Sequence, residues 1–196
     1  MKVSNPQGKA SLPLLAAVQS ARPQQISEKP PLSILEDFCL SALVLGARFR
    51  FKPVAGKAYY LYLHEGRWNL SMVAPEEWSR DPSRHFVASC RLHPDMTWKL
   101  ETATEAMKEP EVQTALLTHL TAFEESISGA GSVEAALPFY LESLPYYQRV
   151  LASGLAVSLS RSIGHLDAGE KMRLESNDEL VNALLAPKRD SDQASP

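Results

Sequence analysis

The chain has 196 residues, of which 44% are hydrophobic and 22% are charged, and its formal net charge is -3 at pH 7. This composition fits a globular protein with one good core, or one core plus a smaller helical unit, and it excludes a chain that is disordered throughout. The N-terminus has no long apolar run of the signal-peptide kind, and residues 150–159 are too short an apolar stretch to cross a bilayer. We therefore expect a cytoplasmic protein with no membrane contact.

The charges are distributed unevenly along the chain. Residues 46–101 contain nine Lys or Arg against six Asp or Glu, whereas residues 102–196 contain seven against fourteen. The two parts could simply neutralise each other where they meet. The only two cysteines, Cys39 and Cys90, lie in apolar patterns and form neither a disulfide framework nor a ligand set, so we expect no metal and no cofactor.

The first elements in chain order are an arm and a helix. Five prolines interrupt residues 1–32, which predicts an extended or mobile arm. Ser33 and Glu36 form a capping-box pattern, and apolar residues at helical spacing continue to a stop at Gly46. Residues 33–101 are then expected to form a helix plus an antiparallel sheet.

The clearest pattern in that sheet is a hairpin over residues 58–73. A tight loop at Glu65-Gly66 would pair two strands. A single register then places the apolar residues of both strands on one face and the polar residues on the other. The inward face would carry Tyr59, Leu61, Leu63, Trp68, Leu70 and Met72, and the outward face would carry Tyr60, Tyr62, His64, Arg67, Asn69 and Ser71.

Three more strands are expected around the hairpin. Residues 49–54 alternate Phe49 and Phe51 with basic residues, residues 86–92 alternate with Phe86, Ala88, Cys90 and Leu92 inward, and residues 96–100 continue the apolar face. The predicted fold is α+β: an antiparallel meander of about five strands, with helices covering one face.

The spacing of apolar residues changes after residue 102 from every second residue, as in a strand, to about every fourth, as in a helix. Thr102 and Glu105 form a second capping-box pattern, Pro110 should start the main helix, and Ser132 should start another helical stretch. A further helix is predicted over 149–163 and a short one from Ser176. Residues 102–186 are thus a helical section that packs on the sheet or on a partner, and residues 187–196 form a polar tail expected to be disordered.

Four segments carry a resemblance to a known family: FRFKPVAGKAYYLY (49–62), SMVAPEEW (71–78), Phe86 and LHPDMTW (92–98). Together with the NPQGK start (5–9), they resemble a domain-of-unknown-function family of small bacterial proteins and an uncharacterised eukaryotic open-reading-frame product. The resemblance covers roughly residues 48–100. It implies a shared fold, and it implies no activity, cofactor or catalytic residue.

Two surfaces are candidates for binding. Aromatic and basic side chains on the outward sheet face suit single-stranded nucleic acid or an anionic small molecule, although such residues are also ordinary on a solvated sheet face. The candidates there are Tyr60, Tyr62, His64, Arg67 and Arg91, with Arg50, Lys52 and Lys99 nearby. In the helix over 149–163, small residues allow either tight internal packing or self-association through Ala152, Gly154, Ala156 and Ser160.

A catalytic site is the third alternative. It would use Glu76 and Glu77 beside Trp78 with a histidine, His64 or His93, and Asp95. No nucleophile elbow, metal spacing or glycine-rich loop accompanies them. We therefore expect a non-enzymatic binding or adaptor module that acts through protein contacts, with nucleic-acid binding as the alternative.

Overall fold

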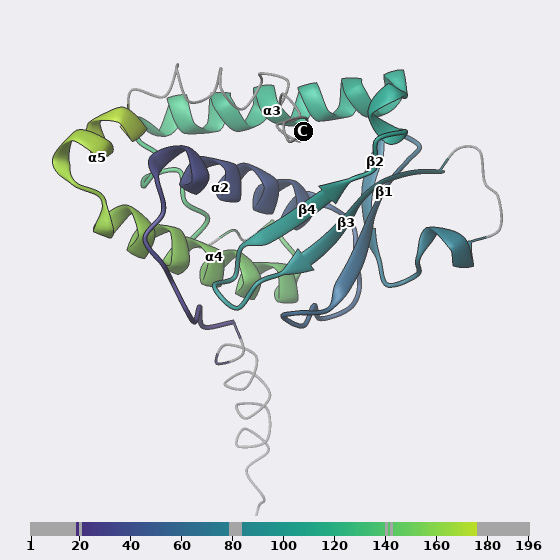
Figure 1. Cartoon of the computed structure of the whole chain (residues 1–196), viewed down its shortest axis with the longest axis horizontal. Helices are drawn as coiled ribbons and strands as arrows, with labels where there is room; N and C mark the ends of the chain where they lie inside the picture. Colours follow the sequence, from purple (N-terminus) through teal and green to yellow (C-terminus); the bar gives the residue numbers. More distant parts are fainter. Residues whose placement is uncertain (1–18, 20, 79–83, 140, 142, 176–196) are drawn as a thin grey trace, which may run out of the picture.

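The computed structural model describes residues 19, 21–78, 84–139, 141 and 143–175. Figure 1 shows long helices lying one above another beside a small sheet, so the architecture is α+β as predicted. No helix in these residues is long and apolar enough to cross a membrane.

Helix α2 (Pro31–Gly46) lies in the middle of the molecule and contacts β4, α4, α5 and α3. It begins at Pro31, where a missing N–H costs nothing, rather than at the predicted capping box two residues later. Ile34, Leu35 and Val44 are fully buried. Because its apolar residues contact several elements, this helix organises a single core that the sheet and the C-terminal helices share.

The sheet has four antiparallel strands in the order β2-β1-β3-β4. They are β1 (Ala58–His64), β2 (Arg67–Ser71), β3 (Arg84–Leu92) and β4 (Trp98–Thr102). The predicted hairpin register is confirmed from His64 opposite Arg67 to Tyr60 opposite Ser71. Glu65 and Gly66 both have positive φ, as the tight loop requires. Met72 lies beyond the end of β2 and is 63% exposed, so its predicted inward position is wrong.

The predicted strand over residues 49–54 does not form. Only Arg48 bridges to β2, at Asn69. Instead, Phe51 packs on Phe49 and stacks on Tyr59, with ring centroids 5.4 and 5.3 Å apart. Both rings lie against the core, which draws the backbone off the sheet edge, and Pro53 has no N–H for a ladder. The sheet therefore has four strands rather than about five.

A β-bulge in β3 changes which side chains face the helices. Leu61 pairs with Ala88 but Tyr62 pairs with Phe86, which leaves Val87 as the extra residue. Val87 and Ala88 are consequently both buried, and Phe86 lies on the outer face against Tyr62 at 5.7 Å. The alternation predicted for residues 88–92 is confirmed, whereas the inward position predicted for Phe86 is wrong because a bulge reverses the phase.

The helical section consists of α3 (Pro110–Ala130), α4 (Tyr146–His165) and α5 (Ala168–Glu175). Pro110 starts α3 as predicted, and Phe123 and Ile127 of its predicted apolar stripe are buried. The predicted second capping box is wrong because Thr102 ends β4 and a single 3-10 turn follows, η2 (Ala106–Lys108). Residues 132–137 form turns rather than a helix, with the hydroxyl of Ser132 accepting a hydrogen bond from the Ala135 N–H.

Helix α5 was not predicted, although its start carries a capping signal. The Glu170 N–H donates to the Asp167 carboxylate at 2.8 Å, and the Asp167 N–H donates to the Glu170 carboxylate at 3.1 Å. This capping box escaped prediction because it begins with aspartate, whereas the predicted boxes begin with serine or threonine. The helix predicted from Ser176 and the tail over 187–196 lie outside the described residues.

Candidate functional site

The predicted ligand residues of the outer sheet face do not form one site. Arg91 lies opposite Ala58 at one end of β1, and Arg67 lies opposite His64 at the other end. Six residues separate these ends, which is about 20 Å at roughly 3.3 Å per residue. One compact ligand cannot contact both arginines.

Tyr62 is buried beneath the segment that follows β2. Its hydroxyl donates to the Val73 carbonyl at 2.9 Å, and the Trp78 indole N–H donates to the same carbonyl at 3.3 Å. Desolvation raises the pKa of Tyr62 to about 12. Only 3% of the residue is exposed. Its predicted role as a stacking platform is wrong because this tyrosine belongs to a small aromatic cluster with Tyr60, Phe86 and Trp78.

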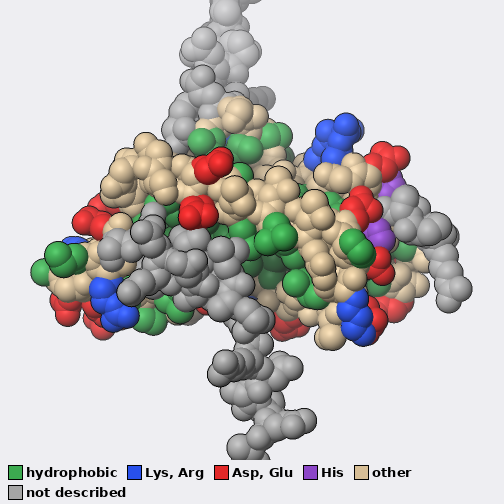
Figure 2. Space-filling view, turned by 90° about the horizontal axis from the view of Figure 1, so that it is seen from above, with side chains coloured by type: hydrophobic (Ala, Val, Ile, Leu, Met, Phe, Trp, Pro, Cys, Tyr) green, Lys and Arg blue, Asp and Glu red, His purple; other side chains and the backbone are tan. Residues whose placement is uncertain are grey.

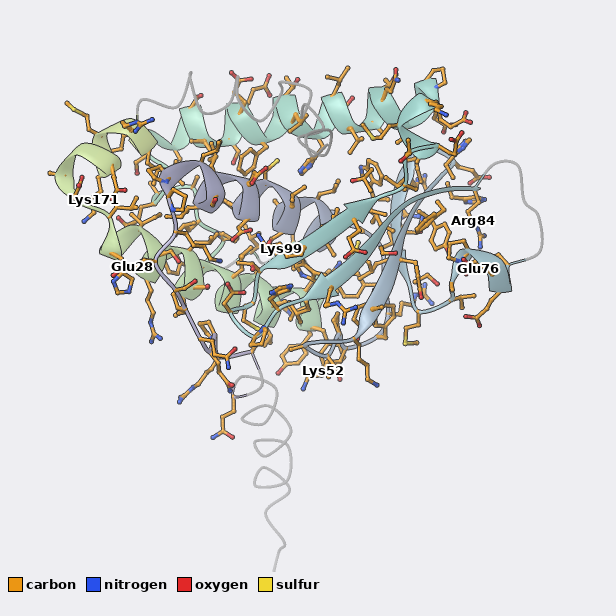
Figure 3. All side chains as sticks on the ribbon, viewed as in Figure 1. Glu28, Lys52, Glu76, Arg84, Lys99 and Lys171 are labelled. Atoms are coloured by element: carbon orange, nitrogen blue, oxygen red, sulfur yellow. The ribbon has the colours of Figure 1, made fainter. Side chains whose placement is uncertain are left out.

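Cations on this side of the sheet already have intramolecular contacts. The Arg84 guanidinium lies 3.7 Å above the Trp78 ring, and Arg91 Nη1 donates to the Gly56 carbonyl at 2.7 Å. Lys99 forms an ion pair with Asp37 of α2, and Figure 3 shows it between β4 and that helix. The outer face thus uses much of its aromatic and basic chemistry to hold the fold.

A buried ion network joins the arm to the sheet edge. Asp37 is completely buried, and Lys29 Nζ lies 2.7 Å from carboxylate oxygens of both Asp37 and Asp95. Burial alone would raise the pKa of Asp95, but hydrogen bonds from Lys29 and Thr97 outweigh it and the pKa is lowered. Burial would likewise lower the pKa of Lys29, but the two carboxylates raise it. The network fastens residue 29 to α2 and to the turn before β4.

Most of the small residues of α4 face inward. Ala152, Gly154 and Ala156 are buried, which agrees with internal packing and leaves no free surface for a second copy at these positions. A Cβ on Gly154 would lie 2.3 Å from the Ala21 carbonyl oxygen, so glycine is needed for the arm to approach. Ser160 is half-buried and donates to the Glu134 carboxylate at 3.2 Å.

The predicted catalytic residues are not assembled either. Glu76 and Glu77 are exposed in η1 (Pro75–Glu77), and Glu77 accepts a hydrogen bond from the Ala74 N–H. Figure 3 shows Glu76 at the right-hand end of the molecule, below Arg84. Asp95 is engaged in the ion network instead. No group of three His, Cys, Asp or Glu that could hold a metal occurs among the described residues.

A buried cysteine and histidine also meet, without the properties of a nucleophile. His119 Nε2 lies 3.0 Å from the Cys39 carbonyl oxygen and 3.8 Å from its sulfur. Desolvation raises the pKa of Cys39 to about 12, so the thiol stays protonated at neutral pH. Burial lowers the pKa of His119 more than its bond to the carbonyl raises it. This pair is a packing contact between α2 and α3.

Three adjoining hollows lie along the exposed side of α4, and we call them together the α4 groove. The first, about 710 Å³, lies between the arm and α4, and the second, about 310 Å³, lies between the arm and residues 52–55. The third, about 730 Å³, lies between residues 45–51 and the start of α4. Ala21 and Val150 line the first two, Tyr146 lines the first and third, and Tyr147 lines the second and third, so the hollows form one continuous surface.

Among the residues that the structure describes, all charged side chains that line the α4 groove are basic. They are Arg22, Arg48, Arg50, Lys52, Arg149 and Arg161. The Arg149 Nε is shielded from solvent and has no hydrogen-bond partner within the described part of the chain. By contrast, Figure 2 shows acidic and basic side chains intermixed on the face above α3. An uninterrupted set of cations around a hollow can hold an anionic ligand.

Sequence reasoning did not find this groove because its cations come from three separate segments. Arg50 and Lys52 were assigned to the sheet face, and Arg149 and Arg161 only bounded an apolar stretch. One local signal was available: Arg149, Ser153, Val157 and Arg161 are four residues apart, so they lie on one ridge of a helix. The arm that forms the opposite wall has no comparable signal.

Comparison with known proteins adds a family. A family model described as protein of unknown function (DUF2452) matches residues 25–122, half of the chain. Searches of curated proteins and of solved structures gave no match. The match includes α2, the sheet and much of α3, and it ends before α4.

Proposed function

The chain belongs to the family of proteins of unknown function DUF2452, and we propose that this member is a non-enzymatic, cytoplasmic binding module that holds an acidic segment of a protein partner in its α4 groove. The observation that carries the proposal is the set of six basic residues around three adjoining hollows, with no acidic residue in the described part of their lining. Such a surface favours an anionic partner both in encounter and in the bound state.

The rest of the lining supports a polypeptide as that partner. Aliphatic residues and prolines alternate with the cations, among them Pro23, Leu45, Val54, Pro145 and Val157. A protein segment can place apolar side chains on these residues while its carboxylates meet the arginines. Exposed Tyr146 and Tyr147 add amphipathic rings of the kind enriched at protein interfaces.

Single-stranded nucleic acid is the second candidate, since six cations would also suit phosphates. One observation weighs against it. Phe49 and Phe51 pack on each other and Tyr146 packs on Tyr147, with ring centroids 5.4 Å apart in each pair, which leaves few ring faces for bases.

Fluorescence anisotropy with two labelled probes tests the proposal. Poly-Glu represents an acidic protein segment and oligo(dT) represents nucleic acid, each titrated at low and at physiological salt. Arg50 and Arg161 are both exposed, so the double change Arg50→Glu and Arg161→Glu should leave the fold intact. We expect it to weaken poly-Glu binding about tenfold or more at low salt.

The matched control is Arg67→Glu, an equally exposed arginine outside the groove, for which we expect a change of less than about twofold. Equal losses for the control and the groove variant would show that binding is nonspecific and would refute the proposal. Tighter binding of oligo(dT) than of poly-Glu, lost with the groove variant, would favour the second candidate.

A further inference from the structure

The first hollow of the α4 groove has a regular floor. Arg149, Ser153, Val157 and Arg161 follow one another at intervals of four residues along α4, and all four line the hollow. Such residues form a continuous ridge inclined slightly to the helix axis. The floor therefore presents a cation at each end and less polar side chains between them.

The opposite wall is held in place by the fold. The Ala21 carbonyl lies against Gly154, and the Gln24 N–H donates to the Pro94 carbonyl at 2.8 Å. Farther along the arm, Lys29 is paired with both Asp37 and Asp95. Contacts on both sides of residues 22–23 thus keep the hollow open before any ligand arrives, which reduces the entropic cost of binding.

Within the described ranges, the cations of this hollow have no counter-ion. Among the described residues, no carboxylate forms an ion pair with Arg22, Arg149 or Arg161. The buried Arg149 Nε has no acceptor in that part of the chain. A shielded N–H without an acceptor loses hydration, and a carboxylate bound at the guanidinium could supply the missing hydrogen bond.

The spacing of the two arginines defines the ligand. Arg149 and Arg161 are twelve residues apart on α4, which is about 18 Å at roughly 1.5 Å per residue. An extended chain advances about 3.3 Å per residue, so five or six of its residues cover that distance. Side chains of an extended chain alternate in direction, and two carboxylates on the same side must be separated by an even number of residues. Six satisfies both conditions.

We propose that the hollow between the arm and α4 binds an extended polypeptide with two carboxylates six residues apart, one at Arg149 and one at Arg161. Apolar residues between them would lie on Pro23, Val150 and Val157, and Arg22 would contact the segment from the arm side. This inference rests on the proposed function, and it adds the conformation and spacing of the partner segment.

Short peptides of identical charge test the spacing. Each peptide carries two Glu in a background of Ser and Val. The second Glu stands six, five or two positions after the first, and each peptide is titrated by anisotropy against the full chain. We expect the six-residue spacing to bind about three- to tenfold more tightly than the two-residue spacing. Equal affinities for all three spacings would overturn the inference.

A double-mutant cycle locates the two contacts. Arg149→Gln and Arg161→Gln are combined with peptides in which either Glu is replaced by Gln, and each arginine should couple to only one of the two positions. Either direction of the peptide satisfies the inference, but the absence of coupling at both positions would contradict it. If Arg149→Gln lowers thermal stability, Arg161→Gln and Arg149→Lys supply the cycle.

Poly-Glu separates this inference from the proposed function. Retained poly-Glu binding that depends on Arg50 and Arg161, together with no preference for spacing, would refute only the extended six-residue register. Absence of poly-Glu binding to the unmodified chain would refute both. Arg67→Gln is the control variant and should leave the spacing preference unchanged.

Discussion

The outer sheet face and the α4 groove contain similar residues and differ in how those residues are satisfied. Both carry arginines and tyrosines. On the sheet face, Tyr62 donates to Val73, Arg91 donates to Gly56 and Arg84 covers Trp78. In the groove, Arg149 and Arg161 have no counter-ion among the described residues and line a hollow of about 710 Å³.

This difference shows that composition alone does not identify a binding surface. Polar groups that are already paired would have to break contacts to bind a ligand, whereas unpaired donors beside a hollow gain contacts. The groove also depends on a distant feature that the sheet face lacks. Its arm wall is fastened by Lys29, Asp37 and Asp95, so changes in that network should affect the groove and spare the sheet face.

The largest effect is expected for Asp37→Asn. Removing this buried charge leaves Lys99 without its carboxylate partner and Lys29 with Asp95 alone, and breaking a buried pair costs about 3 kcal/mol. Urea denaturation would measure the loss, and poly-Glu binding should fall as the arm loosens. Glu101→Gln removes an exposed carboxylate from β4 and serves as the control. A loss below about 1 kcal/mol would show that the network does not hold the arm.

Gly154→Ala should have the next largest effect. The new Cβ would lie 2.3 Å from the Ala21 carbonyl oxygen and 3.1 Å from Met96 Cγ, so the arm or the helix must shift at a cost of about 1 to 3 kcal/mol. Gly164→Ala is the matched control in the same helix, with nothing within 4 Å of the added carbon. It should stabilise the chain by about 0.5 to 1 kcal/mol. Equal effects of the two changes would exclude a tight arm contact.

Trp78→Ala examines the other side of the comparison. The change removes the Arg84 contact at 3.7 Å and the edge contact with Tyr62, and we expect a loss of about 1 to 2 kcal/mol in unfolding free energy. Poly-Glu affinity should stay the same, because the aromatic cluster holds the fold. Met72→Ala, at a 63% exposed position, should change stability by less than about 0.5 kcal/mol. A selective loss of poly-Glu binding in Trp78→Ala would show that the outer sheet face, rather than the α4 groove, binds the acidic segment.

The smallest effect is a pH dependence from His119, which packs between α3 and α2 and belongs to neither region. Its pKa is lowered by burial, so below about pH 6.5 the unfolded chain binds a proton that the folded chain resists. Stability is therefore complete above that pH and decreases as the pH falls through the folded-state pKa. The facing Cys39 thiol remains neutral because burial raises its pKa to about 12. His119→Gln should flatten the curve of unfolding free energy against pH. An unchanged slope would show that other groups cause the pH dependence.

The fold could be predicted further than the site. The hairpin register followed from alternation and from Glu65-Gly66. The start of α3 followed from Pro110, and the apolar stripes of α2 and α3 followed from helical spacing. The bulge at Val87 could not be predicted, because an extra residue in one strand leaves no mark in its own composition. The exclusion of residues 49–54 from the sheet had the same origin, since aromatic packing overrode a strand-like alternation.

Local sequence determined the elements that depend on neighbours along the chain: two alternating strands around a tight loop, and helices with an apolar stripe. Only the tertiary structure decided which cations gather around a hollow, because Arg22, Arg50 and Arg149 approach one groove from distant segments. It also decided that Gly154 receives the arm and that Tyr62 is covered. Periodicity reports the face on which a side chain lies, whereas its partners depend on packing between elements far apart in sequence.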